Sequence, residues 1–368
     1  MSWLTRTELS ARAGKDPGSP GLLIGAIPGE GFVPIPATAR SGLCSRSAAT
    51  LTTAGIERGQ RALVSLNSNG DLSGALFAEA LVEAGALAAV VGPRGRMRTL
   101  AAFRALRPQV WVTTPTGALD FLARLYLEFN VDPVELELDR ILVVGEIASP
   151  GTERRLAAEF EARVTSVYCD PVFGGVWALA NDGKWQVMAS EMLGLGELAR
   201  DALHDPTSIG QCAELVLRPD WPGPFAGASI RTGQVTGRDA TTELFARTVG
   251  DHVLARGRWL SLPLLRRGLA QIDGLAGFTV EIDRGEGTLD KLVLRLAFDR
   301  PGLVENPMWA ARAREAIAAV TPVEFSLERV LADEQTAGER IVDRRGHHLG
   351  SDRVAAARSL ESAGQDRG

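Results

Sequence analysis

The first half of the chain alternates short, fully apolar runs with longer segments whose apolar residues recur every three or four positions. Short apolar runs are typical of buried strands, and the longer period is typical of helices with one buried face. The expected strands are residues 61–66, 86–91, 110–113, 140–144 and 164–168. The expected helices are residues 45–54, 72–84, 99–106, 114–129 and 150–161. Strands that alternate with helices form mostly parallel sheets, so we predict a large α/β domain.

The predicted sheet draws attention to the residues that follow three of its strands. In open parallel sheets, ligands bind outside the carboxyl ends of the strands. The residues at these ends are Thr114, Gly145, Glu146, Tyr168, Cys169 and Asp170. We therefore expect them to share one rim and to include residues that bind a nucleotide or a substrate.

The pattern changes after Gly174. Two apolar runs flank Asn181-Asp182-Gly183, which predicts a β-hairpin, and more β structure is expected at residues 213–217. From residue 254 the order of helices and strands predicts a small α+β domain. We expect a large domain over residues 1–250, a small domain over residues 251–345 and a disordered polar tail over residues 346–368.

Composition narrows the class of protein. Hydrophobic residues make up 45% and charged residues 23% of the 368 residues, which is typical of a globular chain. The net charge of −5 argues against binding to nucleic acid or to an anionic membrane. No apolar run reaches the roughly 18 residues of a membrane span, and the N-terminus lacks an apolar signal segment, so we expect a cytoplasmic protein. The three cysteines and four histidines are too scattered to predict a metal site.

Four short motifs occur in a fixed order along the chain. They are Gly145-Glu146, Val167-Tyr168-Cys169-Asp170-Pro171-Val172-Phe173, Ile230-Arg231-Thr232-Gly233-Gln234, which we expect to form a turn, and Gly250-Asp251-His252-Val253-Leu254-Ala255-Arg256-Gly257. In this order they resemble the phenylacetate–CoA ligase branch of the adenylate-forming (ANL, AMP-binding) superfamily over roughly residues 41–345. The resemblance implies the adenylate-forming-enzyme fold, with a large N-terminal α/β domain and a small C-terminal α+β domain.

The resemblance also implies a reaction in two steps. A carboxylate attacks the α-phosphate of ATP to give an acyl-adenylate and pyrophosphate, and a thiol, usually that of CoA, then displaces AMP. Mg²⁺, backbone N–H groups and cations stabilise the charge that develops on the phosphates. ATP, Mg²⁺ and CoA are therefore expected only if the chain is active.

The family's ATP-binding motifs are altered here. The segment in place of the phosphate loop, residues 25–31, contains Glu30 and lacks Ser and Thr. The family's Mg²⁺-binding Glu falls at Val172, which cannot ligate a hard cation. Asp170, two positions earlier, is a weaker candidate for that role. The Asp that binds the ribose falls at Gln234, which can form hydrogen bonds to a hydroxyl but has no charge.

The C-terminal motifs are retained only in part. The catalytic lysine of the family falls at Glu339, with Arg340 beside it, and the chain has only three lysines. Asp251 and Arg256 keep the family's hinge residues, either as a hinge pair or as a surface ion pair. The N-terminus is shorter than in a full-length member. Tyr168 is either a platform for a ring or a packed core aromatic.

Three hypotheses follow. The favoured one is a divergent ligase-like protein that keeps a carboxylate- or nucleotide-type pocket but adenylates weakly or not at all. The second is an active acid–CoA ligase that uses Arg340 or Arg40 near the phosphates. The third is a non-catalytic interaction partner. Small carboxylates, AMP or CoA are the expected ligands, and a homodimer is compatible with the sequence.

Overall fold

The computed structural model describes most of the chain, in two compact units. The described residues are 2–13, 20–24, 32–66, 73–92, 95–170, 173–181, 184–188, 191–204, 212–237, 244–284, 290–321, 323–333 and 336–365. Described residues up to Ala246 form the first unit, and those from Arg247 form the second.

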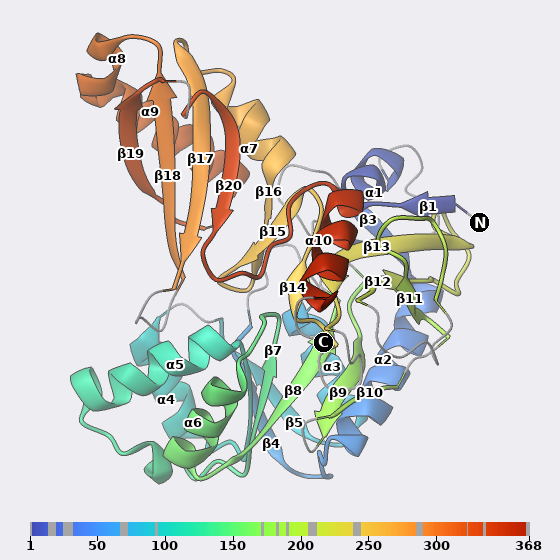
Figure 1. Cartoon of the computed structure of the whole chain (residues 1–368). Helices are drawn as coiled ribbons and strands as arrows, with labels where there is room; N and C mark the ends of the chain where they lie inside the picture. The colour runs from blue at the N-terminus through green and yellow to red at the C-terminus, as the bar shows by residue number, and fades with distance from the viewer. Residues whose placement is uncertain are drawn as a thin grey trace. The chain divides into compact units, whose positions relative to one another are not determined.

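A seven-stranded sheet forms the centre of the first unit (Figure 1). Its strands, in spatial order, are β10 (Lys184–Val187), β9 (Val176–Asn181), β8 (Arg163–Cys169), β7 (Arg140–Val144), β6 (Val110–Thr113), β4 (Arg61–Val64) and β5 (Leu87–Val90). The five strands from β8 to β5 run parallel, and the β9–β10 hairpin is antiparallel. The predicted mostly parallel sheet is confirmed.

Helices cover both faces of this sheet because successive side chains of each strand point to opposite sides. In β6, Val110 and Val112 pack in one core with residues of α2 and α3, while Trp111 packs in another core with residues of α4, α5 and α6. The helices are α2 (Ala37–Thr53), α3 (Ser73–Glu83), α4 (Arg96–Leu106), α5 (Pro115–Arg124) and α6 (Pro150–Phe160), and a π-helical turn (Leu125–Phe129) and a 3-10 turn (Pro133–Leu136) follow α5. The fully apolar strands are thus the buried centre of a three-layer structure.

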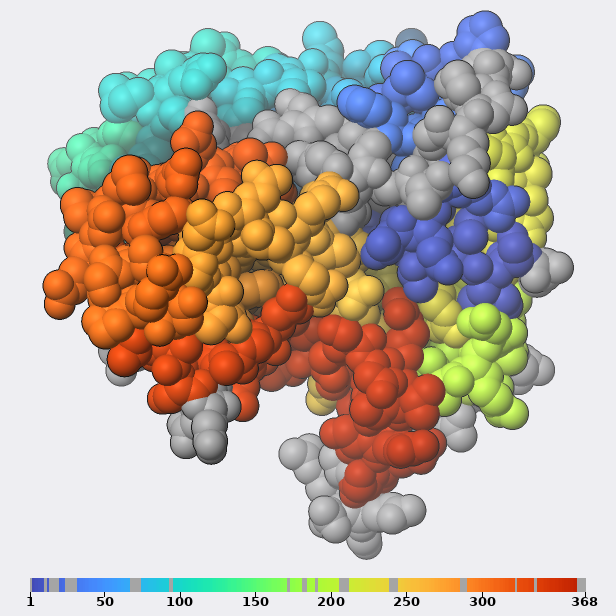
Figure 2. Space-filling model, turned by 90° about the horizontal axis from the view of Figure 1, so that it is seen from above, coloured from blue at the N-terminus to red at the C-terminus, as the bar shows by residue number. Residues whose placement is uncertain are grey.

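A second sheet of the first unit brings the N-terminal residues beside the Arg-Thr-Gly motif. Its strands are β1 (Ser2–Leu4), β13 (Ala228–Val235), β12 (Glu214–Leu217) and β11 (Leu193–Gly196), in that order. β1 pairs parallel to β13, and α1 (Arg6–Ala13) follows it directly. The short strands β2 (Gly21–Ile24) and β3 (Val33–Pro36) pair antiparallel. Figure 2 shows the N-terminal residues, in blue, against the yellow and lime-green residues of this sheet.

The second unit contains a small sheet with helices packed on it. The strand order is β19 (Ser326–Leu331), β18 (Lys291–Phe298), β17 (Leu275–Asp283) and β20 (Gly338–Asp343), with only the central pair antiparallel. Residues of α7 (Leu262–Leu269) and α9 (Pro307–Val320) share one core with it. The unit also contains β14 (Arg247–Thr248), the hairpin of β15 (His252–Ala255) and β16 (Arg258–Ser261), α8 (Pro301–Glu305) and α10 (Arg353–Gln365).

Three local expectations differ from the structure. In place of the disordered tail there is helix α10, because Asp352 caps its first N–H groups, at 2.8 Å from Val354 and 3.2 Å from Ala355, and Ala356 is buried. The helix expected at residue 45 begins eight residues earlier, directly after Pro36, whose extended conformation ends β3. The turn expected at residues 230–234 is a bulge within the continuous strand β13, at Gly233 with φ of +76°.

Candidate functional site

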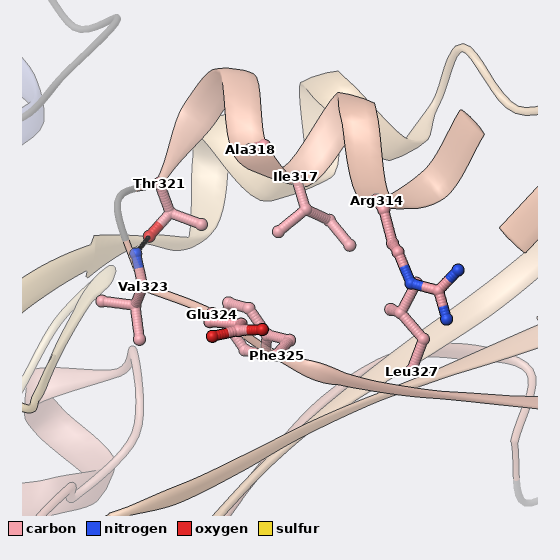
Figure 3. A pocket seen from close by; sticks show the side chains of 8 residues that line it. All are labelled: Arg314, Ile317, Ala318, Thr321, Val323, Glu324, Phe325 and Leu327. Atoms are coloured by element: carbon pink, nitrogen blue, oxygen red, sulfur yellow. Dashed lines mark hydrogen bonds between the residues drawn. The ribbon is translucent and has the colours of Figure 1, made fainter. Parts of the chain in front are cut away.

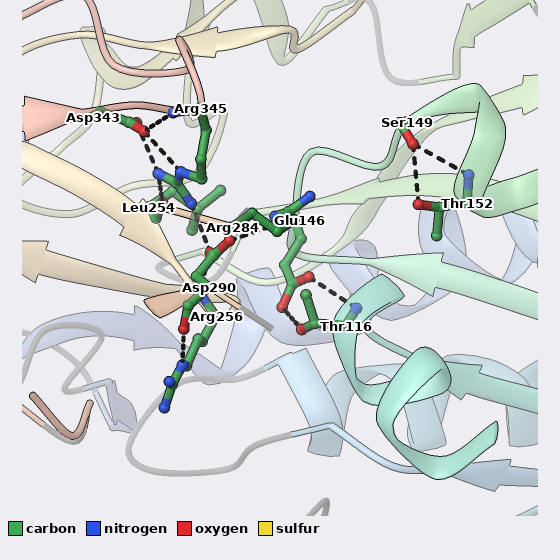
Figure 4. A network of polar contacts seen from close by, with 10 residues as sticks. All are labelled: Thr116, Glu146, Ser149, Thr152, Leu254, Arg256, Arg284, Asp290, Asp343 and Arg345. Atoms are coloured by element: carbon green, nitrogen blue, oxygen red, sulfur yellow. Dashed lines mark hydrogen bonds and ion pairs between the residues drawn. The ribbon is translucent and has the colours of Figure 1, made fainter. Parts of the chain in front are cut away.

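The carboxyl ends of β6 and β7 lie side by side and support the start of α5. The hydroxyl of Thr114 accepts a hydrogen bond from the Gly117 N–H at 3.0 Å and so caps this helix. A side chain at Gly145, where φ is +83°, would meet the methyl group of Thr114. The buried carboxylate of Glu146 accepts hydrogen bonds from the N–H of Thr116, at 3.0 Å, and from its hydroxyl (Figure 4). Glu146 therefore stabilises the N-terminus of α5, where a negative charge is favoured.

Tyr168 and Cys169, at the end of β8, belong to the core. The Tyr168 side chain is only 1% exposed, and its ring centroid lies 5.6 Å from that of Phe245. Its hydroxyl forms no regular hydrogen bond with a described residue, although Thr232 is close enough to influence its pKa. Burial raises the pKa of Tyr168 well above its usual value, and the charge of Asp170 raises it further. The Cys169 thiol is buried as well.

Asp170 is fully buried, at 0% exposure, and is neutralised from within the protein. Arg6 of α1 places its Nη2 at 3.3 Å from the Asp170 carboxylate, and its Nε donates to the Thr232 carbonyl at 2.6 Å. The Phe173 N–H donates to the other carboxylate oxygen at 3.0 Å. An acid held in this way does not fit Mg²⁺, because a metal ion would have to displace a buried guanidinium.

No other metal site replaces it in the part of the chain that the structure describes, where no group of three His, Cys, Asp or Glu residues is placed to hold an ion. Val172 and the phosphate-loop segment at residues 25–31 lie outside the described residues. The expectations attached to them stay predictions.

The Arg-Thr-Gly motif is anchored by a buried glutamate that the sequence did not indicate. Arg231 forms ion pairs with Glu214 at 2.7 Å and with Asp201 at 2.9 Å, and its guanidinium lies 4.6 Å from the centroid of the Trp3 ring. The second oxygen of Glu214 accepts the N–H of Gly233 at 2.9 Å. These contacts stabilise the bulge of β13 and fix the direction of the residues that follow it.

Gln234, the predicted ribose-binding residue of the Arg-Thr-Gly motif, has a side-chain oxygen that forms no hydrogen bond with the described residues. It is 5% exposed, and its backbone N–H donates to the Thr232 hydroxyl at 3.1 Å. Its side-chain oxygen is buried and has no hydrogen-bond partner in the described structure. A buried acceptor without a partner costs about 1–3 kcal/mol, and a hydroxyl group of a ligand would remove that cost.

Asp251 and Arg256, the candidate hinge residues, form no ion pair with each other in the described structure, and the hinge role stays a prediction. Asp251 is exposed, and its carbonyl accepts the Leu262 N–H at 3.0 Å. Arg256 and Gly257, with φ of +50° and +68°, form the two-residue turn between β15 and β16. Arg256 bonds to Asp290, by its N–H to the carboxylate at 3.1 Å and by its Nε to the carbonyl at 2.7 Å.

Asp290 is the centre of a buried network in the second unit (Figure 4). Its carboxylate accepts hydrogen bonds from Arg284 at 2.8 Å and from Arg345 at 2.6 Å. Arg345 also pairs with Asp343 at 2.8 Å and donates to the Leu254 carbonyl at 2.9 Å. Two carboxylates and the Arg345 guanidinium are thus buried together and compensate one another.

Glu339 and Arg340 of β20 are among the residues that line a pocket of about 370 Å³. The Glu339 carboxylate forms an exposed ion pair with Arg266 of α7, whose Nε is 2.6 Å away. The pocket is lined by Leu262, Arg266, Phe278, Glu339, Arg340, Ile341, Gly350 and Ser351. An acid paired with a surface arginine replaces the lysine that the family resemblance predicts in this segment.

Comparison with known proteins identifies the fold. No family model matches the sequence, and no curated protein is similar to it. Among solved structures, 2-hydroxyisobutyryl-CoA ligase, in complex with 2-hydroxyisobutyryl-AMP and CoA, matches with a TM-score of 0.79 at 15% identity, over 99% of this chain and 82% of that one. The o-succinylbenzoate–CoA synthetase of Bacillus subtilis matches with a TM-score of 0.58 at 13% identity, over 81% and 63% of the two chains. The chain has the adenylate-forming-enzyme fold.

The predicted fold class, a large α/β domain and a small α+β domain, is confirmed, and the predicted domain bounds stay predictions. A third match, the amide bond synthetase McbA of Marinactinospora thermotolerans, has a TM-score of 0.56 at 13% identity, over 80% and 63% of the two chains. These identities establish the adenylate-forming fold alone. No described helix of the chain is both long and apolar enough to span a membrane.

Proposed function

We propose that this chain is a divergent, phenylacetate–CoA ligase-like member of the adenylate-forming fold that binds a small carboxylate and an AMP- or CoA-type ligand but activates acids with ATP weakly or not at all. The observation that carries the proposal is the buried Arg6–Asp170 pair. It occupies the only acid of the Tyr168–Phe173 motif that could have replaced the missing Mg²⁺ ligand.

The rate of acid adenylation by this chain is expected to be far below that of an active ligase. Removal of one contact that stabilises a charged transition state typically lowers the rate by about 10²–10³. Here the acid for Mg²⁺ falls at Val172, and Asp170, which could have replaced it, is paired with Arg6. The ribose acid falls at an amide, Gln234, and the lysine falls at Glu339, which forms an ion pair with Arg266. Changes at three separate contacts support a chain with little or no adenylation.

Two features of the large domain support the proposal that the chain still binds a ligand. The unpartnered oxygen of Gln234 can accept a hydroxyl, and the Thr114–Glu146 rim holds the ends of β6 and β7 in a fixed geometry. The 2-hydroxyisobutyryl-CoA ligase structure contains both an acyl-AMP and CoA. We infer ligands of the same chemical classes for this chain, with the acid itself unassigned.

The test is isothermal titration of the full chain with ATP–Mg²⁺, with AMP and with CoA. Binding of AMP or CoA without tight binding of ATP–Mg²⁺ is the expected result. The variant Gln234→Ala should weaken AMP binding, whereas Gln186→Ala, at an exposed glutamine of β10, should not. Tight ATP–Mg²⁺ binding would overturn the proposal in favour of an active acid–CoA ligase. No binding of any of the three would favour a non-catalytic partner.

A further inference from the structure

A second pocket lies within the small domain, between helix α9 and the edge strand β19. It has a volume of about 310 Å³, within the range of small-molecule sites. Its lining residues are Arg314, Ile317, Ala318, Thr321, Val323, Glu324, Phe325 and Leu327. None of them belongs to the motifs that resemble the ligase family, so the proposed function gives this pocket no role.

Apolar side chains form the floor of the pocket (Figure 3). Ile317 is buried and points from α9 toward the strand, while Phe325 and Leu327 are partly buried on β19 and the segment before it. The Thr321 hydroxyl accepts the Val323 N–H at 3.2 Å, which fixes the connection between helix and strand. The pocket therefore offers a fixed apolar surface that could cover a branched or aromatic side chain.

Two residues of opposite charge, Arg314 and Glu324, also line the pocket. The guanidinium of Arg314 and the carboxylate of Glu324 are both exposed, and Figure 3 shows them on either side of Ile317. The structure gives neither of them an ion pair with any described residue. Arg314 has Ala310, Ala311, Ile317 and Ala318 at the neighbouring positions of the helix, so no acid on α9 can pair with it. Both charges remain available to a ligand.

We infer that this pocket binds a free α-amino acid with a branched or aromatic apolar side chain. Its carboxylate would accept hydrogen bonds from Arg314, its ammonium group would donate to Glu324, and its side chain would cover Ile317 and Phe325. A ligand with a carboxylate but no ammonium group would leave Glu324 without a partner. It would also place its own negative charge close to that of Glu324. A zwitterion satisfies both charges at once, which is why charge complementarity selects an amino acid over a simple acid.

The experiment titrates the full chain with leucine and phenylalanine and with their one-charge analogues. These are 4-methylpentanoate and 3-phenylpropanoate, which lack the ammonium group, and 3-methylbutylamine and phenethylamine, which lack the carboxylate. Because both charges are exposed, each of their contacts with the ligand should contribute about as much as an exposed ion pair, so loss of either charge should weaken binding roughly two- to fivefold. Arg314→Gln and Glu324→Gln should weaken amino-acid binding by similar factors.

Control variants distinguish the effect of charges that line the pocket from the effect of other charges on helix α9. Arg312→Gln and Glu315→Gln change exposed charges of α9 that do not line the pocket and should leave binding unchanged. Ala318→Phe, at an exposed lining position, should fill the pocket and abolish binding without disturbing the core.

Three results would overturn the inference: no binding of either amino acid by the unchanged chain, equal binding of the plain carboxylates, or equal losses in the control variants. The proposed function is tested separately, because AMP and CoA binding should persist in Arg314→Gln and amino-acid binding should persist in Gln234→Ala.

Discussion

The rim of the large domain and the α9–β19 pocket of the small domain both contain charged residues, but in opposite states. At the rim, Asp170 and Glu146 are buried and held by hydrogen bonds and an ion pair. At the pocket, Arg314 and Glu324 are exposed and have no ion pair in the described structure. The difference shows that an acid at the usual position of a site does not by itself predict a ligand. What matters is whether its charge is already compensated inside the protein.

The buried charges of the rim and the exposed charges of the pocket should differ in how much they contribute to stability. Removal of one partner of a buried ion pair leaves an uncompensated charge and typically costs about 3–5 kcal/mol, whereas an exposed pair contributes about 0–1 kcal/mol. Stability measurements can therefore distinguish structural charges from charges that are free to bind a ligand.

The largest effect is expected at Arg345. Arg345→Gln leaves the buried carboxylates of Asp290 and Asp343 without their shared guanidinium, so the free energy of unfolding should fall by about 4–5 kcal/mol. The control is the adjacent Arg344→Gln, which breaks an exposed pair with Glu281 and should cost less than about 1 kcal/mol. Urea denaturation followed by circular dichroism measures both, and equal small effects would contradict a structural role for the network.

Arg6→Gln should destabilise the large domain by about 3 kcal/mol, because one buried carboxylate, that of Asp170, loses its ion pair. The double variant Arg6→Gln/Asp170→Asn removes the charge as well and should recover part of the loss. Arg12→Gln, at an exposed residue of the same helix, should have little effect. Denaturation curves of the four proteins give the comparison, and a neutral Arg6→Gln would show that Asp170 does not need its partner.

A pH effect of intermediate size is expected from His348. Burial lowers the pKa of His348 from 6.5 to about 4, and its Nε2 is buried without a hydrogen-bond partner in the described structure. Asp343 and Asp251 raise this pKa and Arg345 lowers it, while the Thr248 hydroxyl lies 3.1 Å from Nδ1. The unfolded chain takes up the proton first, so the stabilisation is complete above about pH 6.5 and is lost as the pH falls toward about 4.

Between pH 7 and pH 5 this linkage should lower the free energy of unfolding by about 2 kcal/mol. His348→Asn should remove most of the slope, and the remainder should come from His347, whose pKa is also lowered by burial. Unfolding curves at half-unit pH intervals test this, and an unchanged slope in His348→Asn would rule out the assignment.

The smallest effect is expected at the pocket of the small domain. Arg314→Gln and Glu324→Gln should each change the free energy of unfolding by less than about 0.5 kcal/mol, because neither residue has an ion pair to lose. The same unfolding assay, without ligand, provides the measurement. A loss above about 1 kcal/mol would mean that these charges are structural after all.

The sequence predicted the apolar framework of the fold well. The strands expected at residues 110–113 and 140–144 are β6 and β7 with the same bounds, because a fully apolar run between breakers has few other conformations in a buried sheet. The common rim of Thr114, Gly145 and Glu146 followed from the parallel order of these strands. The pattern of hydrophobic residues was sufficient to predict those elements whose structure depends on burial.

The partners of the buried charges could not be predicted in the same way. Arg6 and Asp170 are separated by 164 residues, and no local period links them. Gly233 is compatible with a turn or a bulge, and the choice depends on Glu214 from a different strand. Helix α10 did have a local signal, the capping residue Asp352 before an Ala-rich segment, but the polar composition of the tail obscured it. The roles of the predicted site residues themselves stay predictions.

The most direct test of the central claim is ATP–pyrophosphate exchange by the full chain, measured with Mg²⁺ over a panel of aryl and short-chain carboxylic acids. The account predicts no exchange above background with any acid, even when AMP or CoA binds, because the rim acid is paired with Arg6. Acid-dependent exchange at a rate typical of a ligase would contradict it, and would show that other residues of this chain have taken over the activation of ATP.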